Sequence, residues 1–469
     1  MNQAGARISV VSVYTKFEDI HVRQAKGRYT RWRWFFVWLT QAVFYGLPWL
    51  NWNGRQAVLF DLVARKFYLF GLVLFPQDFI FLAVLLIICA YSLFLFTTIT
   101  GRVWCGFSCP QTVYSEIFMW IENKIEGSRS ARIRLARQAM NADKLRKKIS
   151  KHAIWAGIAL WTGLSFVGYF TPIQVLSAEV RNGALGGWEL FWILFYGAAT
   201  YGNAGFMREQ FCRYLCPYAR FQGSMLDKDT LIVSYDKARG EPRGALGKAK
   251  ADVAAKGACI DCSMCVQVCP TGIDIRNGLQ HDCIGCAACI DACDSVMDKI
   301  AAPRGLIRFT TENAMLHQWP LQKIRRNILR PRVLIYSLIL LCMVGAFSFS
   351  LSAHTPLKMN VLRDRANMGR VVSSGAGTAV ENVYRLHVMN SDELPHQYQI
   401  GVLGVAQIRL ASAQYVSLQA TESKTIPVTV QLPAGVGNKG ANPIRFVLQA
   451  TDDARLQISE KATFFVPRE

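Results

Sequence analysis

Long apolar runs alternate with polar, basic stretches over the first 352 residues of this 469-residue chain. Each run is close to the ~20 residues that an α-helix needs to cross ~30 Å of hydrocarbon. The pattern therefore predicts a polytopic α-helical membrane protein with about five transmembrane helices. The five runs are 34–50, 79–98, 153–172, 188–207 and 333–352.

A further apolar stretch, 57–75, differs from these runs because Asp61, Arg65 and Lys66 interrupt it. Charged residues within an apolar stretch favour a position at the membrane surface over a crossing. We expect this stretch to be an interfacial or partly re-entrant segment.

The pattern changes after residue 352. Apolar and polar residues now alternate over short segments, which Gly, Pro, Asn, Asp and Ser separate. Short alternating segments at this spacing predict an all-β, immunoglobulin-like sandwich, although spacing alone leaves a barrel open. The expected strands are 382–390, 397–403, 406–412, 425–432, 444–451 and 460–467.

The formal net charge of +21 lies mainly between the apolar runs. The stretch 101–152 holds eleven Lys or Arg and four Asp or Glu, and 207–332 holds nineteen and thirteen. Basic loops of this kind mark the cytoplasmic side of a membrane protein and attract anionic lipid headgroups. No stripe of base-stacking aromatic residues accompanies the charge, so we expect membrane lipid as a partner and no nucleic acid.

The N-terminus carries no secretory signal, so we expect the first run to be an uncleaved span. Five crossings with the basic loops inside place the N-terminus in the cytoplasm and the β-domain outside. The predicted parts are a cytoplasmic segment (1–33), a membrane domain of four helices with the cytoplasmic loop 101–152 (34–207), a cytoplasmic domain (208–332), a fifth helix (333–352) and the outer β-sandwich (353–469).

Two cysteine runs in the cytoplasmic domain carry the strongest chemical signal. Residues 259–270 read "CIDCSMCVQVCP" and residues 283–293 read "CIGCAACIDAC". Both follow C-x₂-C-x₂-C-x₃-C, the bacterial ferredoxin spacing, in which the fourth cysteine of each run binds the other cluster. The spacing predicts a ferredoxin-like module at about 255–300 with two [4Fe–4S] clusters. The expected ligands are Cys259, Cys262, Cys265 and Cys293 for cluster 1, and Cys283, Cys286, Cys289 and Cys269 for cluster 2.

Zinc and disulfides are the alternatives for these eight thiols. Zinc would need only two C-x₂-C pairs, and a disulfide framework does not suit a loop in the reducing cytoplasm. Two clusters in one small module move single electrons. The sequence has no G-x-G-x-x-G fingerprint and no flavin motif, so we expect electrons to arrive from another protein or from quinol.

A weaker motif occurs twice, as "VWCGFSCP" (103–110) and "FCRYLCP" (211–217). Each copy follows a span that runs from outside to inside, which places both at the cytoplasmic face. Two thiols four residues apart lie on one side of a helix, and Pro110 and Pro217 suit the first position of a following helix. The thiols of the two copies are Cys105, Cys109, Cys212 and Cys216.

Two features favour the thiolate form at these positions. Cys109 and Cys216 would each lie near a helix N-terminus, with Arg102 and Arg213 close by. Such thiolates suit a soft-metal site, for example for Cu(I), a third Fe–S cluster or reversible disulfide chemistry. The plain alternative is that they are small buried residues at helix ends. Because the motif is repeated at matching positions, we favour a functional role.

With these motifs in place, the chain resembles the CcoG family, also called FixG or RdxA, which are accessory proteins in the assembly of cbb-type cytochrome oxidase. The resemblance lies in "WNGRQAVLFDLVARKFYLFG" (52–71), "GRVWCGFSCPQTVYSEIFMWIENKIEG" (101–127), "WTGLSFVGYFTPI" (161–173), "REQFCRYLCPYARFQ" (208–222) and the eight-cysteine run through 300.

The resemblance implies a protein of the bacterial inner membrane with five spans, a cytoplasmic dicluster domain and a periplasmic immunoglobulin-like domain. It further implies reduction of Cu(II) to Cu(I) for delivery to the oxidase binuclear centre, with oxidase subunits or copper chaperones as partners. Cys105, Cys109, Cys212 and Cys216 match the family's two C-x₃-C-P motifs, which are implicated in the copper step.

Three hypotheses follow, and we rank them in the order in which they are given. The first is a cupric reductase, an oxidoreductase that passes electrons from the two clusters to copper at the paired thiolates. The second is an electron-transfer subunit between quinol and a partner reductase. The third is an assembly scaffold whose clusters sense redox state.

Overall fold

The computed structural model describes residues 20–245, 257–353, 355–374 and 377–467. The chain forms two compact units. One consists of the described residues within 20–45, 89–166 and 186–340, and the other of those within 46–88, 167–185 and 341–467.

Each of the five predicted apolar runs forms a helix. Within the described residues, only α2 with its preceding turn (Pro76–Thr100) and α16 are long and apolar enough to cross a membrane. The other three helices are too short or too polar for this. The helix α8 has only 16 residues, α6 begins in a basic stretch, and α1 begins with several arginines. The five helices are α1 Arg28–Gly46, α2 Phe79–Thr100, α6 Ala142–Val167, α8 Gly187–Gly202 and α16 Pro331–Ser352.

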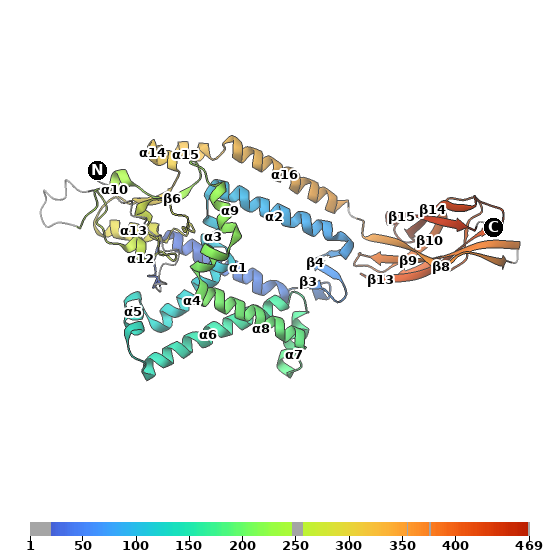
Figure 1. Cartoon of the computed structure of the whole chain (residues 1–469), viewed down its shortest axis with the longest axis horizontal. Helices are drawn as coiled ribbons and strands as arrows, with labels where there is room; N and C mark the ends of the chain where they lie inside the picture. The colour runs from blue at the N-terminus through green and yellow to red at the C-terminus, as the bar shows by residue number, and fades with distance from the viewer. Residues whose placement is uncertain (1–19, 246–256, 354, 375–376, 468–469) are drawn as a thin grey trace, which may run out of the picture. The chain divides into compact units, whose positions relative to one another are not determined.

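The two most apolar helices, α2 and α16, lie side by side (Figure 1). Phe81 and Phe347 approach with ring centroids 6.1 Å apart, and Tyr91 and Tyr336 with centroids 6.0 Å apart. Many other large apolar side chains of both helices are exposed. Helices that expose this much apolar surface are suited to contact with lipid, which agrees with a membrane-associated protein. The count of five spans stays a prediction.

The stretch 57–75, expected to be an interfacial or partly re-entrant segment, is a three-stranded antiparallel meander; its position at the membrane surface stays a prediction. The charged residues that interrupt the apolar pattern form the first turn: Asp61 accepts a hydrogen bond from the amide of Ala64 (2.7 Å), and Arg65 has φ +54°. The flanking apolar residues pair across the strands and are partly buried. The strands are β3 Val58–Asp61, β4 Lys66–Leu69 and β5 Leu72–Leu74, preceded by β1 Asn51–Trp52 and β2 Arg55–Gln56.

Further helices connect these elements. They are η1 Leu47–Trp49, η2 Pro76–Asp78, α5 Arg129–Arg137, α7 Ile173–Asn182, α10 Lys237–Gly240, α14 Glu312–Leu316, α15 Leu321–Asn327 and the π-helical turn η3 Asn203–Met207.

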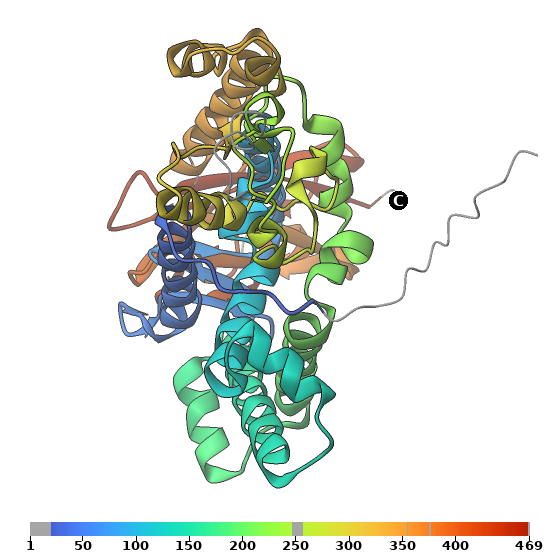
Figure 2. The ribbon, with the colours of Figure 1, turned by 90° about the vertical axis from the view of Figure 1, so that its left-hand side faces the viewer.

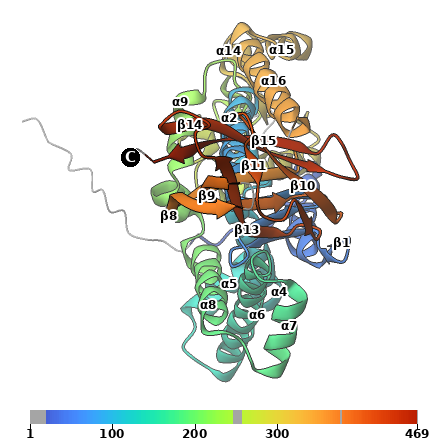
Figure 3. The same cartoon turned by 90° about the vertical axis from the view of Figure 1, so that its right-hand side faces the viewer.

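The C-terminal domain is a β-sandwich of two four-stranded antiparallel sheets, as predicted (Figure 3). One sheet has the order β12-β10-β14-β15 and the other β11-β13-β9-β8. The core lies between them and includes fully buried residues from both, such as Tyr384 and Leu386 of β9 and Phe446 and Leu448 of β14. The strands are β8 Leu357–Ser374, β9 Gly377–Asn390, β10 His396–Leu403, β11 Arg409–Leu410, β12 Tyr415–Leu418, β13 Ser423–Pro433, β14 Gly440–Ala450 and β15 Gln457–Val466.

Two of these strands, β8 and β12, were not predicted. β12 has only four residues, and the pairing of β8 with β9 shifts register between Arg363 and Met368 and again at Arg370. An irregular strand does not keep a strict alternation of apolar and polar residues, because each shift changes which side chains face the core.

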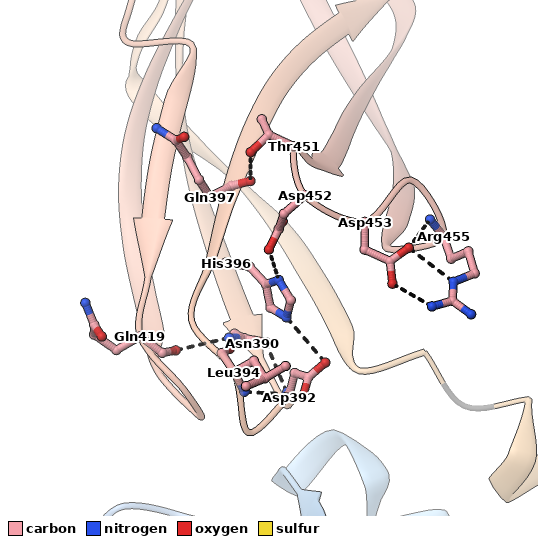
Figure 4. Close-up of polar contacts among 10 residues, drawn as sticks. All are labelled: Asn390, Asp392, Leu394, His396, Gln397, Gln419, Thr451, Asp452, Asp453 and Arg455. Carbon is pink, nitrogen blue, oxygen red and sulfur yellow. Dashed lines mark hydrogen bonds and ion pairs between the residues drawn. The ribbon is translucent and has the colours of Figure 1, made fainter.

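A buried histidine at the start of β10 makes the sandwich sensitive to pH. Nδ1 of His396 lies 2.6 Å from a carboxylate oxygen of Asp452, and Nε2 lies 3.3 Å from one of Asp392 (Figure 4). Burial opposes the charged ring, but the hydrogen bonds to Asp452 and Asp392 outweigh it and raise the pKa of His396. A raised folded pKa adds stability below the unfolded pKa of about 6.5, and this stability is lost as the pH rises through the folded pKa.

We therefore expect β10 and its partner β14 to become less stable as the pH is raised from 5 to 8. Hydrogen exchange of these strands in the full-length protein, corrected for the intrinsic exchange rate, measures the effect. The His396→Gln variant should lose this pH dependence. An unchanged dependence in the variant would assign it to other groups.

Candidate redox site

The predicted ferredoxin-like module is closed by a short antiparallel pair of strands, β6 Ile232–Tyr235 and β7 Ile307–Thr310. Between them, both cysteine runs adopt the same local backbone. Ser263 and Ala287, each directly after the second cysteine of its run, have φ +53° and +59°, and a helix follows each of them. These helices are α12 Met264–Gln267 and α13 Ala288–Lys299, with the short turn η5 Ile275–Asn277 between them.

Two small cavities within the module are lined by the eight cysteines. All fourteen cysteines of the chain lie in its described part, and none forms a disulfide. Each cavity gathers three cysteines of one run with the fourth cysteine of the other, as the spacing predicts. The first is lined by Cys259, Cys262, Cys265 and Cys293, and the second by Cys283, Cys286, Cys289 and Cys269 together with Cys265.

This arrangement fits two cubane clusters. Each cysteine of a cubane binds a different iron, so the sulfurs stand farther apart than the ligands of a single ion. In agreement, no three His, Cys, Asp or Glu side chains of the described residues are close enough to hold one metal ion. Free thiols around two cavities are therefore suited to clusters and not to a single zinc ion.

The C-x₃-C-P motifs lie at breaks between helices. Cys105 is in α3 (Val103–Phe107), and Cys109 is the N-cap of α4 (Pro110–Glu126). In the second copy Cys212 is in the π-helical turn η4 (Phe211–Leu215), and Cys216 is the N-cap of α9 (Pro217–Met225). The prolines open the following helices as predicted.

The expectation that each pair of thiols shares one side of a helix was wrong. Cys109 and Cys216 have extended backbone, with ψ 129° and 109°. Proline disfavours the helical conformation of the residue before it, which ends the preceding helix between the two cysteines.

The two motifs meet although about 100 residues separate them. Gln222 of α9 is fully buried, and its Nε2 donates a hydrogen bond to Sγ of Cys105 (3.3 Å). Arg102 donates from Nη2 to the carbonyl of Ala219, also in α9 (2.6 Å). Each of the four thiols is near enough to at least one other for their charges to interact. We name Cys105, Cys109, Cys212 and Cys216 the four-thiol group.

The prediction of thiolates with a low pKa was wrong for Cys105, Cys109 and Cys212. Burial raises the pKa of Cys105 to about 11 and that of Cys212 to about 12, and it also raises the pKa of Cys109. Arg102 beside Cys105 and the first amides of α4 beside Cys109 act in the expected direction, but desolvation outweighs them. Arg213 instead pairs with Asp282 at 3.0 Å. Without metal these groups are neutral thiols, and binding of a soft cation must displace their protons.

The four-thiol group is attached directly to the dicluster module through main-chain atoms. A Cβ on Gly106 would lie 2.7 Å from both Cα and the amide nitrogen of Cys286. A Cβ on Gly285, which has φ +67°, would lie 3.1 Å from the carbonyl carbon of Arg102. Cys105 also packs against a buried cluster that includes Cys286. The first C-x₃-C-P turn therefore lies against Cys286, one of the cysteines that line the second cavity.

Arg102, Gln222 and Gly106 are the residues whose importance sequence reasoning missed in part. Arg102 was expected only to lower a thiol pKa. Its Nη2 donates to Ala219 of the second motif's helix, and its Nη1 donates to the carbonyl of His281 in the module (2.5 Å). Arg102 therefore joins both motifs to the module. A glycine between two cysteines was a usable signal for close approach of two backbones. Gln222 carried no signal in the sequence.

We expect Gly106→Ala to weaken this attachment by about 1–3 kcal/mol, because the new methyl group has only main-chain atoms to displace. Fe–S absorbance of the variant should then be lost several-fold faster in air. Gly157→Ala in α6 is the matched control, since no described atom lies within 4 Å of its added Cβ. Equal rates of loss in the two variants would contradict the close contact.

Comparisons with known proteins agree with this site. Residues 207–312 match the family described as "4Fe-4S dicluster domain", 82–127 match "4Fe-4S binding domain", and 347–467 match the "IG-like fold at C-terminal of FixG". Protein RdxB of Cereibacter sphaeroides is 38% identical over 463 residues, which cover 96% of this chain and 95% of the relative. The chain belongs to the CcoG/FixG/RdxA family.

The chain is also similar to a second relative and, over a short part, to a solved structure. The nitrogen fixation protein FixG of Rhizobium meliloti is 38% identical, with 90% of this chain and 88% of the relative covered. A crystal structure of a FixG-related protein from Vibrio parahaemolyticus matches at 24% identity with a TM-score of 0.21, covering 24% of this chain and 98% of that one. This CcoG/FixG/RdxA-family protein is thus a membrane-associated iron–sulfur redox protein with two [4Fe–4S] clusters.

Proposed function

We propose that this protein is a cupric reductase of the bacterial inner membrane, in which the four-thiol group receives Cu(II) and releases Cu(I) for a cbb-type cytochrome oxidase. The observation that carries the proposal is the main-chain contact between Gly106 and Cys286. It joins a soft-metal site to an electron-transfer module without an intervening side chain. Oxidase subunits or copper chaperones are the proposed acceptors of Cu(I).

The clusters, when bound, supply one-electron transfer. The residues of the chain do the rest. Cys105 and one partner of the four-thiol group lose protons as copper binds, and their soft sulfurs favour Cu(I) over Cu(II). Gln222 holds Cys105 in place through the 3.3 Å hydrogen bond to its sulfur. For each Cu(II) that becomes Cu(I), the reduced module loses one electron.

The proposed topology has five spans, with the dicluster domain in the cytoplasm and the β-sandwich in the periplasm. Support comes from helices at all five predicted runs and from the basic residues between them. Electrons enter from another protein or from quinol. The relative FixG is named for nitrogen fixation, and a supply of Cu(I) to a respiratory oxidase is compatible with that setting.

The test is made on the purified protein without oxygen. The protein is reduced with dithionite, excess reductant is removed, and Cu(II) is added while Fe–S absorbance and Cu(I), trapped by a chelating dye, are followed together. We expect one Cu(I) for each electron lost from the module. If copper does not reoxidise the protein but a soluble quinone does, the protein is a quinone-linked electron carrier instead.

A further inference from the structure

A cavity of about 710 Å³ lies in the first unit, between the start of α1, α4 and the dicluster module. One wall is the segment 22–27, which leads into α1 and crosses in front of the helices in Figure 2. The amide of Arg23 donates to the carbonyl of Gln267 (2.8 Å) and fixes this segment to the module. Asp291 of α13 accepts from the amide of Thr30 (2.7 Å), which fixes the first turn of α1.

The lining of the cavity is strongly basic. Its one carboxylate among the described residues, Glu116, lies 2.5 Å from Arg33 and neutralises it. Arg132 is almost fully buried and pairs through Nη1 with Glu122 (3.3 Å), but its Nε has no hydrogen-bond partner among the described residues. A buried N–H donor without a partner is costly unless a ligand supplies an acceptor. The five cationic residues of the lining are Arg23, Lys26, Arg31, Arg33 and Arg132.

The remaining lining is apolar and aromatic. Trp34 and Trp120 meet edge to face with centroids 6.0 Å apart, and Met119 lies beside them. Trp34 begins the first predicted span, and tryptophan is enriched where a membrane meets water. A ligand of this cavity must therefore be both anionic and partly apolar.

We propose that the cavity binds the headgroup of an acidic phospholipid from the cytoplasmic leaflet. A phosphodiester offers several acceptor oxygens to the arginines, and its glycerol and first acyl carbons suit the tryptophans. The volume is too large for a single phosphate and lies within the ~300–1,000 Å³ usual for small-molecule sites. Basic pockets at the cytoplasmic ends of membrane helices bind such headgroups.

The position of the cavity gives the bound lipid a second effect. Pro270 directly follows Cys269, Ala288 directly precedes Cys289, and both line the cavity. Cys269 and Cys289 line the cavity assigned to cluster 2. A negative charge near an Fe–S cluster lowers its reduction potential. Acidic lipid should therefore lower the potential of one cluster more than that of the other.

The experiment compares three proteins in lipid nanodiscs. One is the parent, and one carries Arg23→Gln, Lys26→Gln and Arg31→Gln, which are exposed residues of the cavity rim. The control carries Arg134→Gln, Arg137→Gln and Arg146→Gln, which are exposed, outside the cavity lining and equal in charge change. Native mass spectrometry counts retained lipid with phosphatidylcholine alone or with added cardiolipin, and a redox titration follows the clusters by paramagnetic resonance.

We expect the parent and the control to retain cardiolipin at least ten-fold better than the rim variant. In these two proteins, added cardiolipin should lower the reduction potential of one cluster relative to phosphatidylcholine alone. Equal cardiolipin retention by all three proteins would overturn the proposed site. So would a loss of cardiolipin retention in the control as large as that in the rim variant. A separate arm adds glycerol phosphate to protein in neutral lipid; saturable binding as tight as that of cardiolipin would overturn the lipid assignment. None of these measurements uses copper, so they are independent of the proposed reductase activity.

Discussion

Replacing Cys105 and Cys216 together by serine should leave both clusters in place while Cu(II) reoxidises the reduced protein about 100-fold more slowly. Loss of a residue that only hydrogen-bonds to a metal ligand lowers metal affinity or activity about 10- to 100-fold. This change removes two sulfur ligands themselves, one from each motif. Neither residue is among the four expected ligands of either cluster. Iron content and Fe–S absorbance should therefore match those of the parent.

The matched control is Cys89→Ser with Cys342→Ser. These thiols are exposed on α2 and α16 and lie outside both cavities. We expect this variant to reduce copper at the parental rate. If the double variant at 105 and 216 also reacts like the parent, copper is a bulk oxidant of the clusters and the four-thiol group is not where it is reduced.

The largest loss of stability is expected at Glu122, near the C-terminal end of α4. One of its carboxylate oxygens lies 3.0 Å from Arg208 and 3.3 Å from Arg132, and the other lies 3.5 Å from Lys151. Burial opposes the charge of Glu122, but Arg208, Lys151 and Arg132 outweigh it and lower the pKa. Glu122→Gln leaves three buried or half-buried cations around a neutral amide, which should cost about 3–5 kcal/mol of unfolding free energy.

Urea unfolding followed by tryptophan fluorescence measures this loss, because Trp155 stacks on Phe118 beside the network, with centroids 5.0 Å apart. A lowered folded pKa adds stability above the unfolded value of about 4.3 that is lost as the pH falls through the folded pKa. The parent should therefore weaken on acidification and the variant much less. Asp143→Asn, which removes an exposed partner of Lys147, is the control and should change little. Equal losses in both variants would contradict the role of burial.

The parts of this molecule that the sequence predicts are those with a strict local period. The cysteine spacing predicted which thiols share a cavity, since the fourth cysteine of each run does lie with the other run. Alternation predicted most strands of the sandwich. The charged residues of 57–75 gave no sign of the strands that flank them, because Asp61 and Arg65 belong to a hairpin turn that only the folded structure shows.

The four-thiol group shows where local reasoning ends. The prolines correctly indicated the start of α4 and α9. The pKa of Cys105 depends on how deeply the folded chain buries it, and the meeting of the two motifs depends on Gln222 and on Arg102. Burial and long-range contact are properties of the packed structure and leave no trace in the spacing of a motif.

The contact between Gly106 and Cys286 has a kinetic consequence. Because main-chain atoms make it, the separation between the first C-x₃-C-P turn and the backbone of Cys286 does not depend on which rotamer a side chain occupies. Exposed side chains change rotamer in picoseconds to nanoseconds, and such motions leave a main-chain contact in place. In the proposed reductase, electron transfer between the two sites should therefore be ungated, with a rate independent of solvent viscosity.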